Sequence, residues 1–204
     1  MENRVYKVLL AGEGGQGVQT IGHVLARAAF EQGLNVAYMP NYGVEQRGGV
    51  SLGYLQIGTG IIGFPKFSKA DYIVNMRSRA IERIIQYVDS DTLYIYDSDL
   101  INNSELKTTN AQKLPIAATS TASSRLSPQI FNMILTGAIL YELKVIERIY
   151  VEKALDIILA KKYKEKPQLR NFNKKALEIG AKLAKEAFSP VKKTSVLDRL
   201  GDKK

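Results

Sequence analysis

The spacing of hydrophobic residues changes along this chain and predicts the order of its elements. Three continuous apolar runs are typical of strands buried on both faces: YKVLLAG from residue 6, ADYIVNM from residue 70 and TLYIYD from residue 92. Over residues 15–32 the apolar residues return every three or four positions, which predicts a helix packed on a sheet. Gly33 ends that helix, and NVAYMP from residue 35 is the second strand. These elements predict a βαβ unit with a right-handed crossover.

The middle of the chain carries shorter patterns. Residues 50–58 alternate between apolar and other side chains and predict a strand, which the sequence GTG turns back as a hairpin into residues 61–64. Residues 77–88 have the spacing of an amphipathic helix, and LPIAATS over residues 114–120 predicts a last short strand.

After Pro128 the pattern becomes helical throughout. We expect helices over residues 128–143, 151–163 and 171–188, the first of them apolar all round and therefore buried. The fold class is therefore α/β, a mostly parallel doubly wound sheet of Rossmann-like type with a C-terminal helical layer. We expect one domain over residues 1–190, divided into an α/β core (1–127) and C-terminal helices (128–190). Residues 191–204 are expected to form a flexible tail.

Composition supports a globular protein. The 204 residues are long enough to bury a sizeable core, and 45% hydrophobic with 24% charged residues is typical of such chains. No stretch approaches the roughly 18 uncharged apolar residues of a transmembrane helix, so we expect no membrane span. The first residues lack the layout of a signal peptide, which favours a cytoplasmic location.

Cysteine is absent and His23 is the only histidine. These two facts exclude disulfides, a thiolate nucleophile, cysteine-held zinc, the usual ligands of iron–sulfur clusters and any site built from several histidines. We therefore predict no metal ligands here, and metal-based redox chemistry must sit on another chain. His23 lies in the helix after the first strand, and we expect it to be a surface or interface residue.

The net charge of +9 is unevenly distributed, with 12 basic against 11 acidic residues over residues 1–130 and 17 against 9 over residues 131–204. The C-terminal lysines follow helical spacing with few aromatic residues among them. This pattern favours a solvated helix face, with a docking surface for an acidic partner chain as the second interpretation. A nucleic-acid-binding tail is a third, less favoured one.

A glycine-rich turn, GEGGQG, follows the first strand. Gly12, Gly14 and Gly17 fit the G-x-G-x-x-G spacing, in which backbone N–H groups at a helix N-terminus face a phosphate. A dinucleotide site also needs an acidic residue where the second strand ends, but the first acid there is Glu45. A tight turn for close strand–helix packing and a free-standing NAD(P)-dependent oxidoreductase therefore both remain interpretations.

A second glycine cluster, YGVEQRGG, spans residues 42–49 and contains Glu45 and Arg47, which could pair to shape the loop. Both clusters follow the carboxyl ends of predicted parallel strands, where open α/β sheets hold their sites. On composition alone, an ordinary surface loop is an equally good interpretation.

Together the two clusters resemble those of the gamma subunit of 2-oxoacid:ferredoxin oxidoreductases. The G-x-G-G-Q-G turn of that family matches Gly12, Gly14, Gly15, Gln16 and Gly17. Its second loop matches Tyr42, Gly43, Glu45, Arg47, Gly48 and Gly49. Weaker likenesses follow in the same order as far as residue 185, at Pro65, Ala70, Asp71, Asn132, Gly137, Asn173, Ala176 and Gly180.

The resemblance implies a heteromeric complex that decarboxylates a 2-oxoacid on thiamine diphosphate and Mg²⁺, passes electrons through iron–sulfur clusters and forms an acyl-CoA, in anaerobic metabolism. In that family thiamine diphosphate is held by alpha and beta chains and the clusters by beta or delta chains. This chain would be an accessory subunit, inactive alone, that partners these chains or forms a homodimer when isolated. The sequence of its second loop, EQRGG, favours 2-oxoglutarate as substrate over pyruvate or another 2-oxoacid.

The resemblance gives the two glycine clusters two alternative roles. They help to receive the phosphates of coenzyme A, for which backbone donors and an arginine are suited, or they pack against the alpha chain. The candidate residues are Gly12, Gly14, Gly15, Gln16, Gly17, Tyr42, Glu45, Arg47, Gly48 and Gly49.

Overall fold

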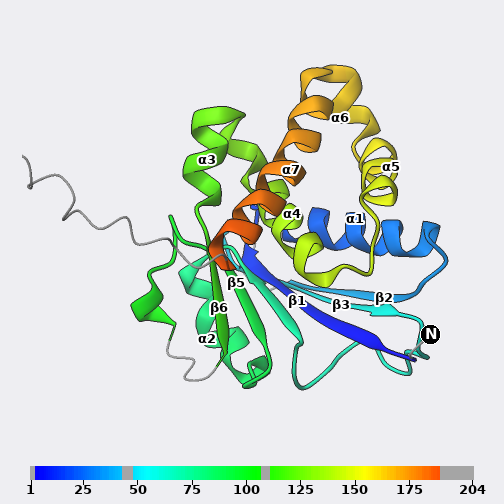
Figure 1. The fold of residues 1–204 in the computed structure, drawn as a ribbon, viewed down its shortest axis with the longest axis vertical. Helices are drawn as coiled ribbons and strands as arrows, with labels where there is room; N and C mark the ends of the chain where they lie inside the picture. Colours follow the sequence, from blue (N-terminus) through cyan, green and yellow to red (C-terminus); the bar gives the residue numbers. More distant parts are fainter. Residues whose placement is uncertain (1–2, 43–47, 107–110, 189–204) are drawn as a thin grey trace, which may run out of the picture.

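A six-stranded sheet in the order β2-β3-β1-β4-β5-β6 forms the centre of the molecule (Figure 1). The structure, a computed structural model, describes residues 3–42, 48–106 and 111–188. The strands are β1 (Val5–Glu13), β2 (Asn35–Tyr42), β3 (Val50–Gly58), β4 (Tyr72–Asn75), β5 (Leu93–Asp97) and β6 (Gln112–Ile116). β1, β4, β5 and β6 run parallel, whereas β3 is antiparallel to both of its neighbours. The predicted mostly parallel α/β sheet is confirmed.

The first two strands run parallel, as the predicted βαβ unit requires, but they are not neighbours in the sheet. β3 lies between them, with Leu9 of β1 opposite Tyr54, and Tyr38 of β2 opposite Leu55. The strand predicted over residues 50–58 is confirmed as β3, and all nine of its residues are buried because it is an interior strand.

The predicted hairpin into residues 61–64 is also wrong, because these residues form no strand. Side chains hold this segment in place of a ladder: Asn35 Nδ2 donates to the Gly60 carbonyl (3.1 Å) and Gln56 Nε2 to the Phe64 carbonyl (2.6 Å). The segment therefore runs beside β3 as an ordered loop.

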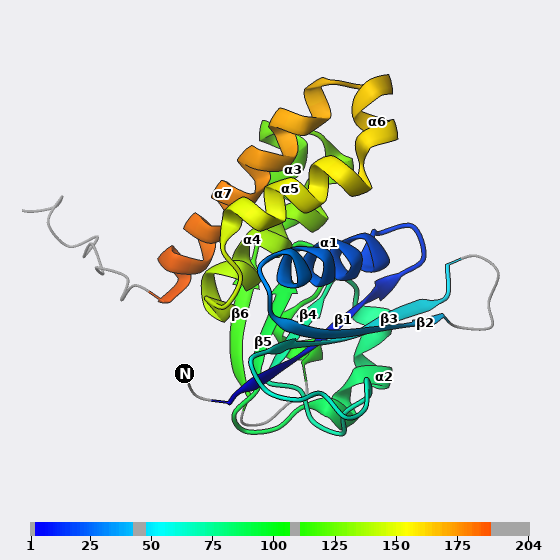
Figure 2. The same ribbon diagram turned by 90° about the vertical axis from the view of Figure 1, so that its right-hand side faces the viewer.

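Most helices cover one face of the sheet, and α2 lies on the other (Figure 2). The first group is α1 (Val18–Glu31), α3 (Ala118–Arg125), α4 (Phe131–Leu143), α5 (Arg148–Ile158), α6 (Ala160–Glu165) and α7 (Gln168–Phe188). α2 (Ile81–Ile84) has short 3₁₀ turns on either side, at Ser78–Ala80 and Ile85–Tyr87, in place of the single helix predicted over residues 77–88. The predicted helix over 151–163 is likewise divided into α5 and α6.

The C-terminal helical layer is present, and its central helix α4 is buried over most of its length, as its uniformly apolar sequence predicts. The predicted last strand ends at Ile116, and α3 begins at Ala118. The predicted tail, residues 191–204, lies outside the described residues. None of the helices within the described ranges has the length and apolar character that crossing a bilayer requires.

This topology determines where a site can form. α1 leaves the carboxyl end of β1 on one face of the sheet, while the segment after β4 leads to α2 on the opposite face. The neighbouring carboxyl ends of β1 and β4 are therefore the point at which the chain changes faces. In open α/β sheets such a point is the usual place for a ligand.

Candidate functional site

The glycine turn between β1 and α1 is held by the side chain of Gln16. Gln16 Oε1 accepts from the Glu13 N–H (2.8 Å), and the Gln16 N–H donates to the Glu13 carbonyl (3.1 Å). A Cβ on Gly12 would come within 2.8 Å of Gln16 Oε1, so a larger residue there would have to displace the folded-back Gln16 side chain. Gly17 has φ +87°, a left-handed conformation that glycine adopts without strain, and it opens α1.

The two glycine clusters meet at this edge of the sheet. The Gly14 N–H donates to the Gly49 carbonyl (3.0 Å), and Arg79 Nη1 donates to the Gly48 carbonyl (3.1 Å). Tyr42 is the last residue of β2. Gly43, Glu45 and Arg47 lie outside the described residues. The structure thus brings the described ends of the second cluster against the first.

Two arginines after β4, not among the sequence-predicted candidates, lie beside this junction. Arg77 Nε pairs with Glu13 Oε2 at 3.2 Å, and Arg79 contacts Gly48 as described. Nothing in the sequence indicated their place, because the pairing of β4 with β1 brings them there.

The crevice between β1 and β4 is occupied by the protein itself. Gln16 Nε2 donates across it to the Met76 carbonyl (3.5 Å). β3 also separates the carboxyl end of β1 from that of β2, where a dinucleotide fold holds the ribose. Both features disfavour the NAD(P) interpretation.

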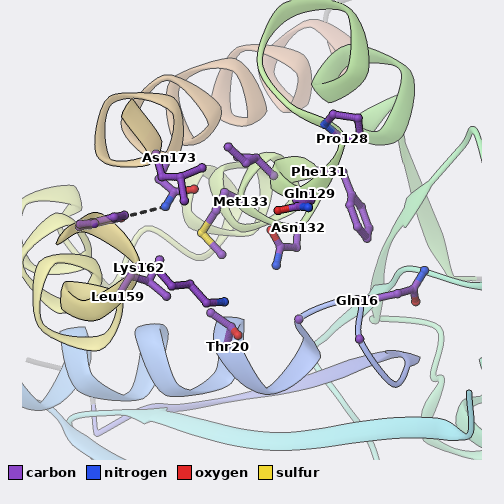
Figure 3. Close-up of a pocket in the computed structure, with 15 residues that line it drawn as sticks. Gln16, Thr20, Pro128, Gln129, Phe131, Asn132, Met133, Leu159, Lys162 and Asn173 are labelled. Carbon is purple, nitrogen blue, oxygen red and sulfur yellow. Dashed lines mark hydrogen bonds between the residues drawn. The ribbon is translucent and has the colours of Figure 1, made fainter. Parts of the chain in front are cut away.

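A pocket of about 520 Å³ opens instead between the glycine turn and the helical layer (Figure 3). This volume lies within the range of small-molecule sites. Of the sequence-predicted candidates it is lined by Gly15, Gln16 and Gly17. The other lining residues come from α1 and from the C-terminal helices: Thr20, Pro128, Gln129, Ile130, Phe131, Asn132, Met133, Leu159, Lys162, Tyr163, Leu169 and Asn173.

Two helices begin at this pocket. α1 starts after Gly17, and the helical segment that continues into α4 starts at Pro128; neither has a side-chain cap on its first turn. The positive ends of both helix dipoles therefore face the cavity. Lys162 adds a full positive charge, and none of the fifteen lining residues is a carboxylate. The cavity favours an anion.

Asn132 supports that conclusion independently of the helix ends. Its side chain is about nine-tenths buried, lines the pocket and has no hydrogen-bond partner in the part of the chain that the structure describes. Its Nδ2 lies over Gly17, where a Cβ would collide with it. Figure 3 shows the amide pointing toward the turn. An amide that lines a cavity without a protein partner is free to hydrogen-bond to a ligand.

The far wall of the pocket combines a hydrogen-bonded polar pair with apolar side chains. Asn173 is buried and its Nδ2 donates to the Tyr163 hydroxyl (2.8 Å), while burial raises the pKa of Tyr163 and keeps it neutral. Met133, Leu159 and Leu169 lie nearby. His23 is not part of the pocket; it is exposed and stacks edge-on against Tyr38, with ring centroids 5.0 Å apart.

Comparison with known proteins gives a consistent result. Residues 7–183 match the family described as pyruvate ferredoxin/flavodoxin oxidoreductase. A 2-oxoglutarate synthase subunit KorC from Archaeoglobus fulgidus is 30% identical over 92% of this chain and 92% of that protein.

Two solved structures share the fold. The gamma subunit of a keto/oxoacid ferredoxin oxidoreductase from Geobacter sulfurreducens superposes with a TM-score of 0.74 at 23% identity, covering 89% of this chain and 99% of that one. A 2-oxoglutarate:ferredoxin oxidoreductase from Magnetococcus marinus, solved with 2-oxoglutarate, coenzyme A and succinyl-CoA bound, superposes with a TM-score of 0.78 at 25% identity. It covers 91% of this chain, which spans 32% of that longer one.

Proposed function

This chain belongs to the pyruvate ferredoxin/flavodoxin oxidoreductase family, and from that premise we propose that it is the gamma-type subunit of a complex that oxidatively decarboxylates a 2-oxoacid to an acyl-CoA. The homologues are subunits of oxidoreductases that act on 2-oxoacids. The role proposed for this chain is accessory: it lacks the cysteines that iron–sulfur clusters need, and its one histidine lies outside the pocket.

The proposal assigns the remaining chemistry to partner chains. Alpha- and beta-type chains, with a delta-type chain where present, would hold thiamine diphosphate, Mg²⁺ and the iron–sulfur clusters. The complex would work in the cytoplasm, where coenzyme A is supplied. We propose 2-oxoglutarate as the substrate, because the Archaeoglobus relative and the Magnetococcus enzyme both carry that name.

We further propose that the pocket receives phosphates of coenzyme A. The observation that carries this proposal is the placement of Gly15, Gln16 and Gly17 in one cavity with Lys162 and no carboxylate. Backbone N–H groups at the start of a helix, together with a lysine, are the donors that bind phosphate in many proteins. The unpartnered amide of Asn132 supplies a further donor at the same place.

The part of the glycine turn away from the pocket suits the second role considered for it. Gly12, Gly14 and Gly49 do not line the pocket, and exposed Gly14 joins the second cluster through its hydrogen bond to Gly49, beside exposed Gly48. We propose that the exposed residues of this junction pack against the alpha-type chain. The two proposed roles thus belong to the residues that line the pocket and to those that do not.

Reconstitution tests the proposed function. Alpha- and beta-type chains encoded beside this one should reduce a ferredoxin-type acceptor with 2-oxoglutarate and coenzyme A only when this chain is added. The isolated chain should show no turnover with any 2-oxoacid and no reduction of NAD⁺ or NADP⁺. Turnover by the isolated chain would overturn the accessory role. Tight, salt-dependent DNA or RNA binding that is lost on removing residues 161–204 would favour the nucleic-acid interpretation instead.

A further inference from the structure

We propose that Lys162 makes this pocket selective for a nucleotide that carries a second, separate phosphate, as coenzyme A does at its ribose 3′ position. The inference rests on the proposed placement of coenzyme A phosphates at the glycine turn. It adds a specificity-determining residue on a different element, α6, which the sequence motifs do not include.

Lys162 differs from several cations of the helical layer that pair with carboxylates. Arg148 pairs with Glu152 and Glu178, Lys174 with Glu152, and Arg170 with Asp156. Lys162 has no such carboxylate in the part of the chain described, and it lines the pocket. Figure 3 shows its amine extended toward Thr20, on the glycine-turn side of the cavity. Its charge is available to a ligand.

The pocket therefore has two positions that favour an anion. One is formed by Gly17, Asn132 and the starts of two helices, and the other by the Lys162 amine. Met133 and Leu159 contribute apolar surface to the same pocket. Coenzyme A presents a diphosphate and a monophosphate on one ribose, so its adenosine end carries two separate anionic groups. A dinucleotide without the monophosphate would leave Lys162 without a partner.

The adjacent residue, Lys161, provides a matched control. Lys161 has the same charge, is exposed on the same short helix and does not line the pocket. Asn173 and Tyr163 are hydrogen-bonded beside Lys162, and neither substitution touches that pair. Replacing Lys161 or Lys162 by alanine changes the net charge equally, so any difference in ligand affinity between the two variants is due to the position of the charge.

The test is calorimetric titration of the full chain with coenzyme A and with dephospho-CoA. Wild type should bind coenzyme A about tenfold more tightly or better, Lys162→Ala should bind both ligands equally, and Lys161→Ala should keep the preference. Lys162→Arg should retain most of it. Thermal unfolding of each variant confirms that it is folded.

Failure of the role proposed for Lys162 can be distinguished from failure of the coenzyme A placement. If wild type binds both ligands equally, or if Lys162→Ala keeps the preference, the role of Lys162 is overturned while the phosphate site at the glycine turn stands. If neither ligand binds the full chain, alone or in the reconstituted complex, the placement of coenzyme A in this pocket is overturned, and the role of Lys162 with it.

Discussion

The main-chain N–H of Gly14 donates a hydrogen bond to the main-chain carbonyl of Gly49 across 3.0 Å, joining two glycine clusters that lie one helix and one strand apart in the sequence. A Cβ on Gly14 would lie 3.8 Å from the Gly48 nitrogen and 3.9 Å from the Gly49 oxygen, which is ordinary contact. The junction therefore depends on the backbone at Gly14 and not on the absence of its side chain.

Gly14→Ala and Gly17→Ala should differ clearly in their effect on the free energy of unfolding. Alanine at position 17 would be forced into the left-handed region at φ +87° and would collide with Asn132. We expect Gly17→Ala to lower the free energy of unfolding by about 1–2 kcal/mol, and Gly14→Ala to change it by less than about 0.5 kcal/mol. Urea denaturation of both variants measures the difference. Equal losses would contradict this description of the turn.

Asn132→Asp should weaken coenzyme A binding. The substitution preserves the shape of a side chain that lies over Gly17 but places a carboxylate where we propose a phosphate. Like charges brought together in a desolvated site cost several kcal/mol, so we expect an affinity loss of at least about tenfold. Asn132→Ala, which removes only a donor, should cost less. Calorimetric titration gives both values, and an Asp variant that binds as tightly as wild type would exclude a phosphate at this position.

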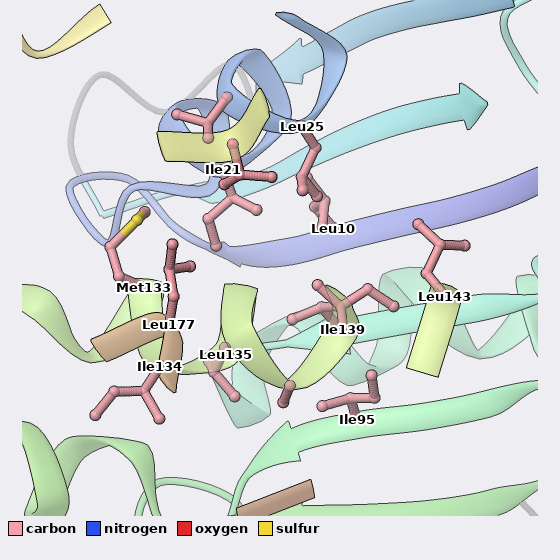
Figure 4. Packing of buried hydrophobic residues seen from close by; sticks show 14 of the residues in the cluster. Leu10, Ile21, Leu25, Ile95, Met133, Ile134, Leu135, Ile139, Leu143 and Leu177 are labelled. Atoms are coloured by element: carbon pink, nitrogen blue, oxygen red, sulfur yellow. The ribbon is translucent and has the colours of Figure 1, made fainter. Parts of the chain in front are cut away.

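Gly180→Ala should destabilise the helical layer. α4 and α7 approach so closely that a Cβ on Gly180 would fall on the Ile134 carbonyl and one on Gly137 on the Leu177 carbonyl; Figure 4 shows Ile134 and Leu177 in this packing. The clash should outweigh the gain of about 1 kcal/mol in helix propensity and leave a net loss of about 1–3 kcal/mol.

Gly63→Ala is the control for that variant, because no atom lies within 4 Å of a Cβ at position 63. Its midpoint of chemical denaturation should stay near that of wild type. A Gly180→Ala protein as stable as Gly63→Ala would show that the two helices are not in such close contact.

Glu142→Gln should stabilise the protein at neutral pH. Glu142 Oε1 is buried and has no hydrogen-bond partner among the described residues, and burial raises the pKa of this carboxyl above its ordinary value of 4.5, opposed by the charge of Lys144. A raised pKa in the folded state means that the native protein favours the protonated carboxyl. The stability that this group contributes is therefore present in acid and is lost as pH rises through its folded-state pKa. Glutamine resembles the protonated form.

Denaturation midpoints of wild type and Glu142→Gln should therefore coincide near pH 3 and diverge as pH rises above the ordinary carboxyl range, with the variant more stable. The exposed Glu165 provides the control, since Glu165→Gln removes the same charge from a solvated position. A constant difference between Glu142→Gln and wild type at every pH would show that the carboxyl does not titrate differently in the native state.

The strands, the first helix and the helical layer follow from the sequence because each has a strong local pattern. Strand order does not follow from local pattern, because the spacing of hydrophobic residues carries no information on which strands pair, and β3 lies between β1 and β2. The same spacing could not show that Asn35 and Gln56 side chains hold the segment around residues 61–64. The glycine turn was predicted from its motif. Lys162 and Arg77 were not assigned to the site, because their positions depend on how distant elements pack. Asn132 was noted in the sequence only as one of the weaker likenesses to the family, and not as a site residue.

The most direct test of the central claim is a crystal structure of the full chain with coenzyme A. We expect density for the diphosphate beside Gly15, Gly17 and Asn132, and for the 3′-phosphate within hydrogen-bond distance of Lys162 Nζ. An occupied coenzyme A site elsewhere, with this pocket left empty, would contradict the account.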